Sequence, residues 1–254
     1  MLFVFDVDGT LSFDGTKIAE PIVDAIKGIE RQGHEIAFAS ARPIRDLTPI
    51  IPDFKAEHLL IGGNGSIVQT KEGKIEVITP IDSDSLGEIK HVIKQYALSY
   101  IVDDVWNFSA KVDSSNKIYK QLDPDNLAEN IELEAIESPI KIILLNVPDV
   151  EFDALLLRLK RNTSVSVVAH SGENSIDITA RGINKFSTLR KFYTDGYNAF
   201  GNDSNDFELL KNANKSIWVG GKNERLGKLN LVPDYIVDGS VDDVSNLIKE
   251  VANA

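Results

Sequence analysis

An apolar strand that runs directly into a pair of acidic residues restricts the fold of this chain more than any other feature. Residues 3–5 are Phe, Val and Phe, and they lead into Asp6 and Asp8, with Gly9 directly after them. Such an ending places two carboxylates at the carboxyl edge of a sheet, where open α/β folds bind ligands, and the glycine allows a sharp turn. Two like charges this close repel each other, and a Mg²⁺ ion with oxygen ligands relieves the repulsion. An Asx-capped turn has the same sequence pattern, so other motifs are needed to distinguish a binding site from a structural turn.

Strands and helices alternate in residues 1–80 and again in 184–254. The first part predicts strands at 2–7, 35–40 and 59–61, helices at 21–32 and from residue 43, and a hairpin with its turn at 71–74. The last part predicts a helix after residue 184, strands at 199–201, 216–219 and 235–237, and helices at 206–213 and 241–251. This order is typical of a doubly wound, mainly parallel sheet in an α/β fold.

The pattern changes between residues 81 and 183. Helices are predicted at 83–96 and 150–161, and strands at 100–102, 108–112, 140–146, 165–169 and 175–179. Apolar and polar residues alternate in 175–179, as in a half-exposed antiparallel strand. We therefore predict a discontinuous core domain at 1–80 and 184–254, and an inserted α+β domain at 81–183.

Composition narrows the chemistry and the partners. The formal charge is −12, with acidic residues throughout the chain, which argues against nucleic acid or an anionic membrane as a partner. There is no cysteine, and the four histidines form no paired metal spacing, so candidate nucleophiles are oxygen atoms. The chain begins in a strand pattern without a basic leader or a segment of membrane-spanning length, so a cytoplasmic location is expected.

Two further polar positions fall at predicted element boundaries. Ser40 ends the second strand just before Pro43 opens a helix, where a hydroxyl can donate to a phosphate oxygen; helix capping explains it equally well. Lys185 stands where the chain re-enters the core and can bring positive charge to a phosphoryl group, whereas an isolated lysine is usually a solvated surface residue.

A cluster of acids and amides follows the strand at 199–201. Asn202, Asp203, Asn205 and Asp206 offer several oxygen ligands at another strand end. Helix capping accounts for one of these residues but not for four.

The order of these motifs resembles the haloacid dehalogenase superfamily of phosphohydrolases. The large insertion is similar to that of the Cof-type branch, subfamily IIB with a C2B cap, and Gly63-Asn64-Gly65 is similar to a segment common in that branch. The resemblance implies that Asp6 is the nucleophile that forms an aspartyl-phosphate. It implies that Asp8 is the general acid and base.

The same resemblance implies the binding residues. Ser40, Lys185 and Asn205 would bind phosphate, and Asn64 and Arg42 would contact the substrate. Asp6, Asp8, Asn202 and Asp206 would form the Mg²⁺ site, Asp8 through its backbone carbonyl. Relatives carry an aspartate where this chain has Asn202, so we expect weaker metal binding, with Asn202 as the ligand and Asp203 turned toward the helix start.

The resulting hypothesis is a Mg²⁺-dependent phosphomonoesterase of small phosphorylated metabolites, with sugar phosphates as the expected substrates. A phosphotransferase or mutase using the same intermediate remains an alternative, as does a non-catalytic phosphometabolite-binding protein suggested by Asn202. The insertion should cover the site, with the loop 171–174 as a candidate for specificity. We expect a monomer or a weak homo-oligomer that binds neither nucleic acid nor membrane.

Overall fold

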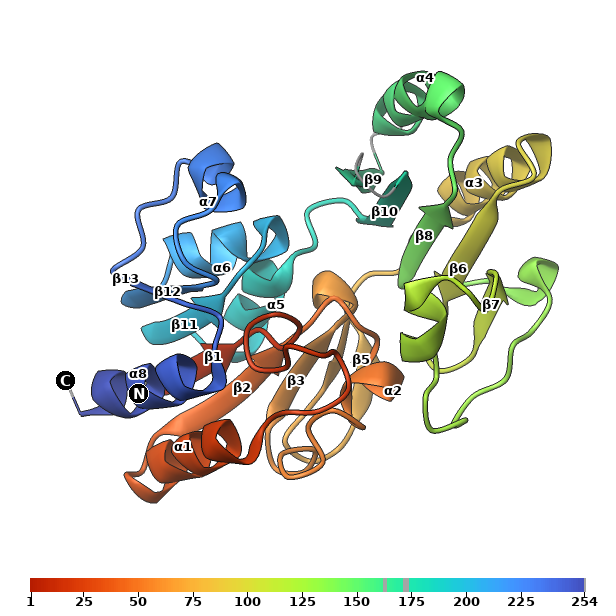
Figure 1. The fold of residues 1–254 in the computed structure, drawn as a ribbon. Coiled ribbons are helices and arrows are strands. Elements are labelled where there is room, and N and C mark those ends of the chain that lie inside the picture. The colour runs from red at the N-terminus through yellow and green to blue at the C-terminus, as the bar shows by residue number, and fades with distance from the viewer. Residues whose placement is uncertain (162–163, 171–173, 254) are drawn as a thin grey trace.

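The chain forms two separate β-sheets, each covered by its own helices (Figure 1). The structure is a computed structural model that describes residues 1–161, 164–170 and 174–253. In this part of the chain, an eight-stranded sheet has the order β13-β12-β11-β1-β2-β3-β4-β5 and a five-stranded sheet has the order β7-β6-β8-β10-β9. No helix of the described residues is long and apolar enough to cross a membrane.

The larger sheet is mainly parallel, and β1 lies at its centre. Its parallel strands are β1 (Leu2–Phe5), β2 (Glu35–Ala39), β3 (Leu59–Gly62), β11 (Tyr197–Gly201), β12 (Lys215–Val219) and β13 (Tyr235–Val237). A hairpin of β4 (Ile67–Gln69) and β5 (Ile75–Val77) adds two antiparallel strands at one edge. Every residue of β1 is buried, as expected for a strand covered on both faces.

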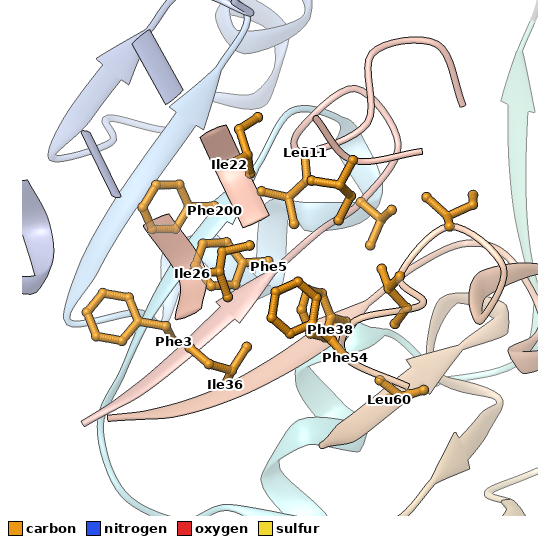
Figure 2. Packing of buried hydrophobic residues seen from close by; sticks show 14 of the residues in the cluster. Phe3, Phe5, Leu11, Ile22, Ile26, Ile36, Phe38, Phe54, Leu60 and Phe200 are labelled. Carbon is orange, nitrogen blue, oxygen red and sulfur yellow. The ribbon is translucent and has the colours of Figure 1, made fainter. Parts of the chain in front are cut away.

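Helices cover both faces of this sheet, and alternate residues of β1 pack against them. On one face lie α1 (Glu20–Arg31) and α8 (Val241–Ala252); Phe3 and Phe5 pack there, the latter 4.8 Å from Phe200 between ring centroids (Figure 2). On the other face Leu2 and Val4 join a cluster formed with α5 (Lys185–Phe192), α6 (Phe207–Lys211) and α7 (Glu224–Leu229). The predicted doubly wound α/β core is therefore confirmed.

The smaller sheet is antiparallel. It contains β6 (Ser99–Asp103), β7 (Phe108–Lys111), β8 (Lys141–Leu145), β9 (Val165–His170) and β10 (Ser175–Ala180). Helices α3 (Ser83–Gln95) and α4 (Asp149–Arg161) pack with Ile142, Leu144, Ile176 and Ile178 on one face. Because side chains alternate along a strand, Lys141 and Asp177 lie on the other face.

A buried arginine of the core binds residues of the smaller sheet and of the loop after β6. Arg45 lies in the short helix α2 (Ile44–Leu47), and its guanidinium pairs with Asp46 at 2.7 Å and with Asp103 of β6 at 2.9 Å. It also donates to the backbone oxygen of Trp106 at 2.7 Å and stacks 4.8 Å from the ring of Phe108. The arginine side chain is fully buried, so these contacts fix where the second sheet sits on the core.

Some predicted elements differ in detail. The helix predicted at 206–213 is a 3-10 turn at Ser204–Asp206 followed by α6, and the helix predicted from residue 43 is only the four residues of α2. Helix α7 was not predicted; further 3-10 turns occur at Gly63–Gly65, Lys117–Gln121 and Leu133–Ala135. Residues 171–173 of the loop predicted to contribute to specificity lie outside the described residues.

Candidate active site

A cavity of about 190 Å³ lies at the carboxyl ends of the central strands, between the two sheets. The core contributes most of its wall, and the smaller sheet contributes two neighbouring residues of β9 and β10. The lining residues are Asp6, Asp8, Ala41, Asn64, Val168, Asp177, Asn202, Asp203, Ser204 and Asn205. Strand ends of a parallel sheet are the usual ligand-binding edge, so this cavity is the candidate active site.

Asp6 is the first residue after β1, and both of its carboxylate oxygens have donors. Its backbone N–H donates to the oxygen of Phe200 at 2.9 Å, which continues the pairing of β1 with β11. Lys185 Nζ donates to Oδ1 at 2.6 Å, and Thr10 Oγ1 donates to Oδ2 at 2.7 Å. Burial, followed by the charge of Asp206, raises the pKa of Asp6 to about 7. Lys185 and Thr10 act in the opposite direction but do not cancel that effect.

Lys185 is buried between two carboxylates. It is the first residue of α5, where the side chain of Asn184 caps the helix, and its Nζ lies 2.6 Å from Asp6 and 2.6 Å from Asp206. Burial alone would lower the pKa of Lys185, but the two carboxylates raise it above its usual value. The lysine therefore carries a fixed positive charge directly behind Asp6.

Asp206 supports the site from behind the cavity wall. Its Oδ1 accepts from Lys185, and its Oδ2 accepts the backbone N–H groups of Asn202 and Asp203 at 2.9 and 3.1 Å. The residue is fully buried and is absent from the cavity wall. In this arrangement, Asp206 positions the lysine and the loop after β11, and both of its oxygens are already engaged.

Asp8 is held by Arg42 rather than left free. The guanidinium donates to the two oxygens of Asp8 at 2.8 and 2.6 Å and also to the oxygen of Gly15 at 2.8 Å. Arg42, predicted as a substrate contact, is thus used to orient Asp8 and does not line the cavity. Ser40 is also fully buried; its Oγ accepts the N–H of Arg42 at 3.1 Å, and Ala41 lines the cavity instead.

The loop after β11 supplies amide groups. Gly9 has a φ of +77°, a backbone conformation that favours glycine, and a Cβ at this position would lie 2.1 Å from Nδ2 of Asn202. Asp203 caps the N–H of Ser204 at 2.6 Å, as the sequence predicts for its side chain.

The side chains of Asn64 and Asn205 both line the cavity and are hydrogen-bonded to each other. The Nδ2 of Asn205 donates to Oδ1 of Asn64 at 3.0 Å. The Oδ1 of Asn205 is buried and has no hydrogen-bond partner within the described structure. Buried polar atoms are rarely left without a partner, so this pair is suited to a polar ligand.

The donor set fits Mg²⁺. Asp6, Asp8 and Asn202 line one cavity and offer carboxylate, carbonyl and amide oxygens, the ligands that this ion prefers. Within the described residues, no group of three or more His, Cys, Asp or Glu side chains could hold a metal on its own. Mg²⁺ takes one or two carboxylates and completes its shell with substrate phosphate and water.

Sequence reasoning missed three contributors to the site. Thr10 belongs to the first motif, and its hydroxyl bond to Asp6 could have been expected from that position. Val168 and Asp177 come from the insertion. The alternation in 175–179 predicts that Asp177 lies on the polar face of its strand, but it does not show that this face lines the cavity. Among the predicted residues, Asp6, Asp8, Asn64, Asn202 and Asn205 line the cavity, and Ser40, Arg42, Lys185 and Asp206 lie behind it.

Comparisons with known proteins agree with this site and fold. A family model described as haloacid dehalogenase-like hydrolase matches residues 3–232. Two Bacillus subtilis enzymes named 5-amino-6-(5-phospho-D-ribitylamino)uracil phosphatase are 21% and 22% identical over 95% and 86% of the chain, and the matches cover 91% and 86% of those proteins.

Solved structures show the same fold over the whole chain. A Streptococcus mutans protein has a TM-score of 0.80 at 20% identity, and a subclass IIB sugar phosphatase has a TM-score of 0.78 at 18% identity. Each match covers 100% of this chain and 99% of the other.

The chain belongs to the haloacid dehalogenase-like hydrolase family. The predicted family, the predicted fold class and the predicted enzyme class are therefore confirmed.

Proposed function

We propose that this protein is a Mg²⁺-dependent phosphomonoesterase that hydrolyses sugar or polyol phosphates through a phosphorylated Asp6. The observation that carries the proposal is the arrangement around Asp6: a carboxylate at the floor of a cavity, a buried lysine 2.6 Å behind it, and Asp8 on the same wall. Phosphoryl transfer depends mainly on positioning and charge stabilisation, and these groups supply both.

In the first step, an oxygen of Asp6 attacks phosphorus, and the bond between phosphorus and the ester oxygen breaks. The Thr10 hydroxyl and the Lys185 ammonium orient the Asp6 carboxylate for this attack. Asp8, in its protonated form, gives a proton to the leaving oxygen. Arg42 holds the Asp8 carboxyl in place through two hydrogen bonds.

In the second step, water attacks phosphorus, Asp8 accepts the proton of that water, and the bond from Asp6 to phosphorus breaks. Free phosphate and the original Asp6 carboxylate are the products. Asn64 lines the cavity, where its side-chain N–H can donate to a phosphoryl oxygen, and Asn205 holds Asn64 in place by donating to its Oδ1 at 3.0 Å.

Asp6, the backbone carbonyl of Asp8 and the side-chain oxygen of Asn202 would hold Mg²⁺, and Asp206 would support them through the loop it binds. When bound, the ion neutralises negative charge on the phosphoryl group. The insertion at 81–183 acts in this proposal as a cap, supported by the two cap residues in the cavity wall.

The substrate class rests on relatives and on the cavity. The names of two relatives specify a phosphorylated ribityl group, and one structural neighbour is a sugar phosphatase. Among the lining residues of the described structure, none is aromatic and most are polar, which suits a hydroxylated leaving group.

Phosphate release from a panel of sugar and polyol phosphates tests this proposal. Wild-type protein with Mg²⁺ should release phosphate, whereas Asp6→Asn should not. Asp153→Asn, which removes an exposed carboxylate from α4, serves as the matched control and should behave as wild type. Release by Asp6→Asn at the wild-type rate would overturn the mechanism, and transfer to an added sugar instead of water would identify a phosphotransferase.

A further inference from the structure

Among the described residues, the cavity wall presents carboxylates and no cation. Four of the lining residues are aspartates, namely Asp6, Asp8, Asp177 and Asp203. Among the described residues, no lysine, arginine or histidine belongs to that wall.

Three of the cations that balance these aspartates are buried behind the wall, and the fourth, Arg225, is exposed. Lys185 pairs with Asp6, and Arg42 pairs with Asp8. Lys141 pairs with Asp177 at 2.9 Å, and Arg225, whose side chain is 63% exposed, pairs with Asp203 at 3.2 Å. The side chains of Lys185, Arg42 and Lys141 are exposed by 0%, 8% and 6%, so a ligand in the cavity meets the carboxylates and not their partners.

Asp177 is the charged residue that the cap adds to this wall. It lies in β10 directly opposite Val168 of β9, on the sheet face that turns away from α3 and α4. Lys141, diagonal to it on β8, binds its Oδ2 at 2.9 Å and donates to the backbone oxygen of Ala41 at 3.4 Å. Asp177 is therefore held in place by a contact that also joins the cap to the core.

We propose that Asp177 selects the leaving group of the substrate, and that this site accepts neutral or cationic leaving groups and rejects anionic ones. The proposal rests on the proposed function, because the phosphoryl group must bind at Asp6 on the core side. The rest of the substrate then points toward the cap, where it meets an apolar side chain and a carboxylate. Hydroxyl and ammonium groups donate to that carboxylate.

A second anion on the substrate meets no cation among the described residues that line this cavity. Lys185 is buried between Asp6 and Asp206, and a bound Mg²⁺ would balance the charge of the phosphoryl group. A carboxylate or second phosphate on the leaving group would face the carboxylate of Asp177, while Lys141, the cation bound to Asp177, is buried behind it; like charges brought together in this way disfavour binding. The substrates are therefore phosphomonoesters of polyols, sugars or amino sugars that carry no other acidic group.

Three hexose esters of similar size test the charge rule: glucosamine 6-phosphate, glucose 6-phosphate and 6-phosphogluconate. For wild-type protein, kcat/KM should be highest for the amine or the neutral ester and lowest for the carboxylate. Asp177→Asn should narrow the ratio of amine to carboxylate by roughly tenfold or more, the effect of losing one charge-assisted hydrogen bond. Asp153→Asn removes the same charge from the outer face of the cap and should leave the ratio unchanged.

Binding separates this proposal from the proposed function. In Asp6→Asn protein, calorimetry should rank the three esters by affinity in the same order as their kcat/KM values. Adding Asp177→Asn should reduce the differences in affinity between them. Equal rates and affinities for the neutral and the carboxylate esters would overturn the charge rule, and wild-type data alone decide this if Asp177→Asn does not fold. Ordered binding without turnover in wild type would overturn the proposed function and still support the charge rule.

Discussion

Replacing the nucleophile should make the metal-free protein more stable at alkaline pH. Burial and the charge of Asp206 raise the pKa of Asp6 to about 7 from a usual value of 3.8. Between these two values the folded protein keeps a proton that the unfolded chain has lost, so stability falls as the pH rises from about 4 to about 7. One pKa unit corresponds to about 1.4 kcal/mol, which gives a loss of roughly 4 kcal/mol across this window.

Asp6→Asn has no charge to bury at that position, so its stability should not show this fall. With a chelator present, the melting temperature of Asp6→Asn minus that of wild type should increase by roughly 10 °C between pH 4 and pH 8. This is the shift expected from a stability change of about 4 kcal/mol in a domain of this size. Scanning calorimetry at several pH values measures the difference, with Asp153→Asn as the control for loss of an exposed carboxylate.

In the presence of Mg²⁺, wild type should be more stable than Asp6→Asn, because the ion stabilises the ionised Asp6 carboxylate and has fewer ligands in the asparagine variant. Parallel pH profiles for wild type and Asp6→Asn without metal would refute the reasoning, since they would mean that burial does not disfavour the ionised carboxylate.

Three more predictions concern single side chains. Asp8→Asn should lower turnover by roughly 10²- to 10⁴-fold through loss of the general acid and base, measured as steady-state phosphate release; near-wild-type rates would remove Asp8 from that role. Asn202→Asp should lower the Mg²⁺ concentration for half-maximal activity by restoring a charged ligand. If only Asp203→Asn changes this concentration, Asp203 is the metal ligand and Asn202 is not. Arg45→Met should destabilise the protein by about 3–5 kcal/mol, because Asp46 and Asp103 lose their buried cation; an unchanged denaturation midpoint would contradict this.

The elements that carry long apolar patterns could be predicted from the sequence. Strand β1 and helix α1 fall within two residues of the predicted ranges because burial on a sheet imposes a regular spacing. Helix α7 was missed: it has six residues, contains Gly227, and shows only its Asn223 cap as a signal. Helix α2 ends at Leu47; Thr48 keeps helical backbone angles (φ −60°, ψ −34°), and Pro49, which has no N–H to donate, cannot continue the helical hydrogen bonds.

The candidate site was predictable where a motif sits at a strand end, and less so where roles depend on tertiary pairing. Asp6 and Asp8 could be placed from their strand. The contact of Lys185 with Asp206 joins two helices, and the contact of Arg42 with Asp8 joins two loops. Only the folded arrangement shows that Arg42 is occupied by Asp8, or that Asp177 of the cap reaches the cavity.

The most direct test of the account is to locate the phosphoryl group during turnover. Wild-type protein, mixed with Mg²⁺ and an isotopically labelled phosphomonoester and quenched rapidly in acid, should carry the label on the peptide that contains Asp6. With an ester whose leaving group needs no proton, such as a nitrophenyl phosphate, the label should accumulate in Asp8→Asn, because that variant cannot activate water, and it should be absent in Asp6→Asn. Rapid hydrolysis with no label on Asp6 in either active protein, or label on another residue, would contradict the central claim that Asp6 is the nucleophile.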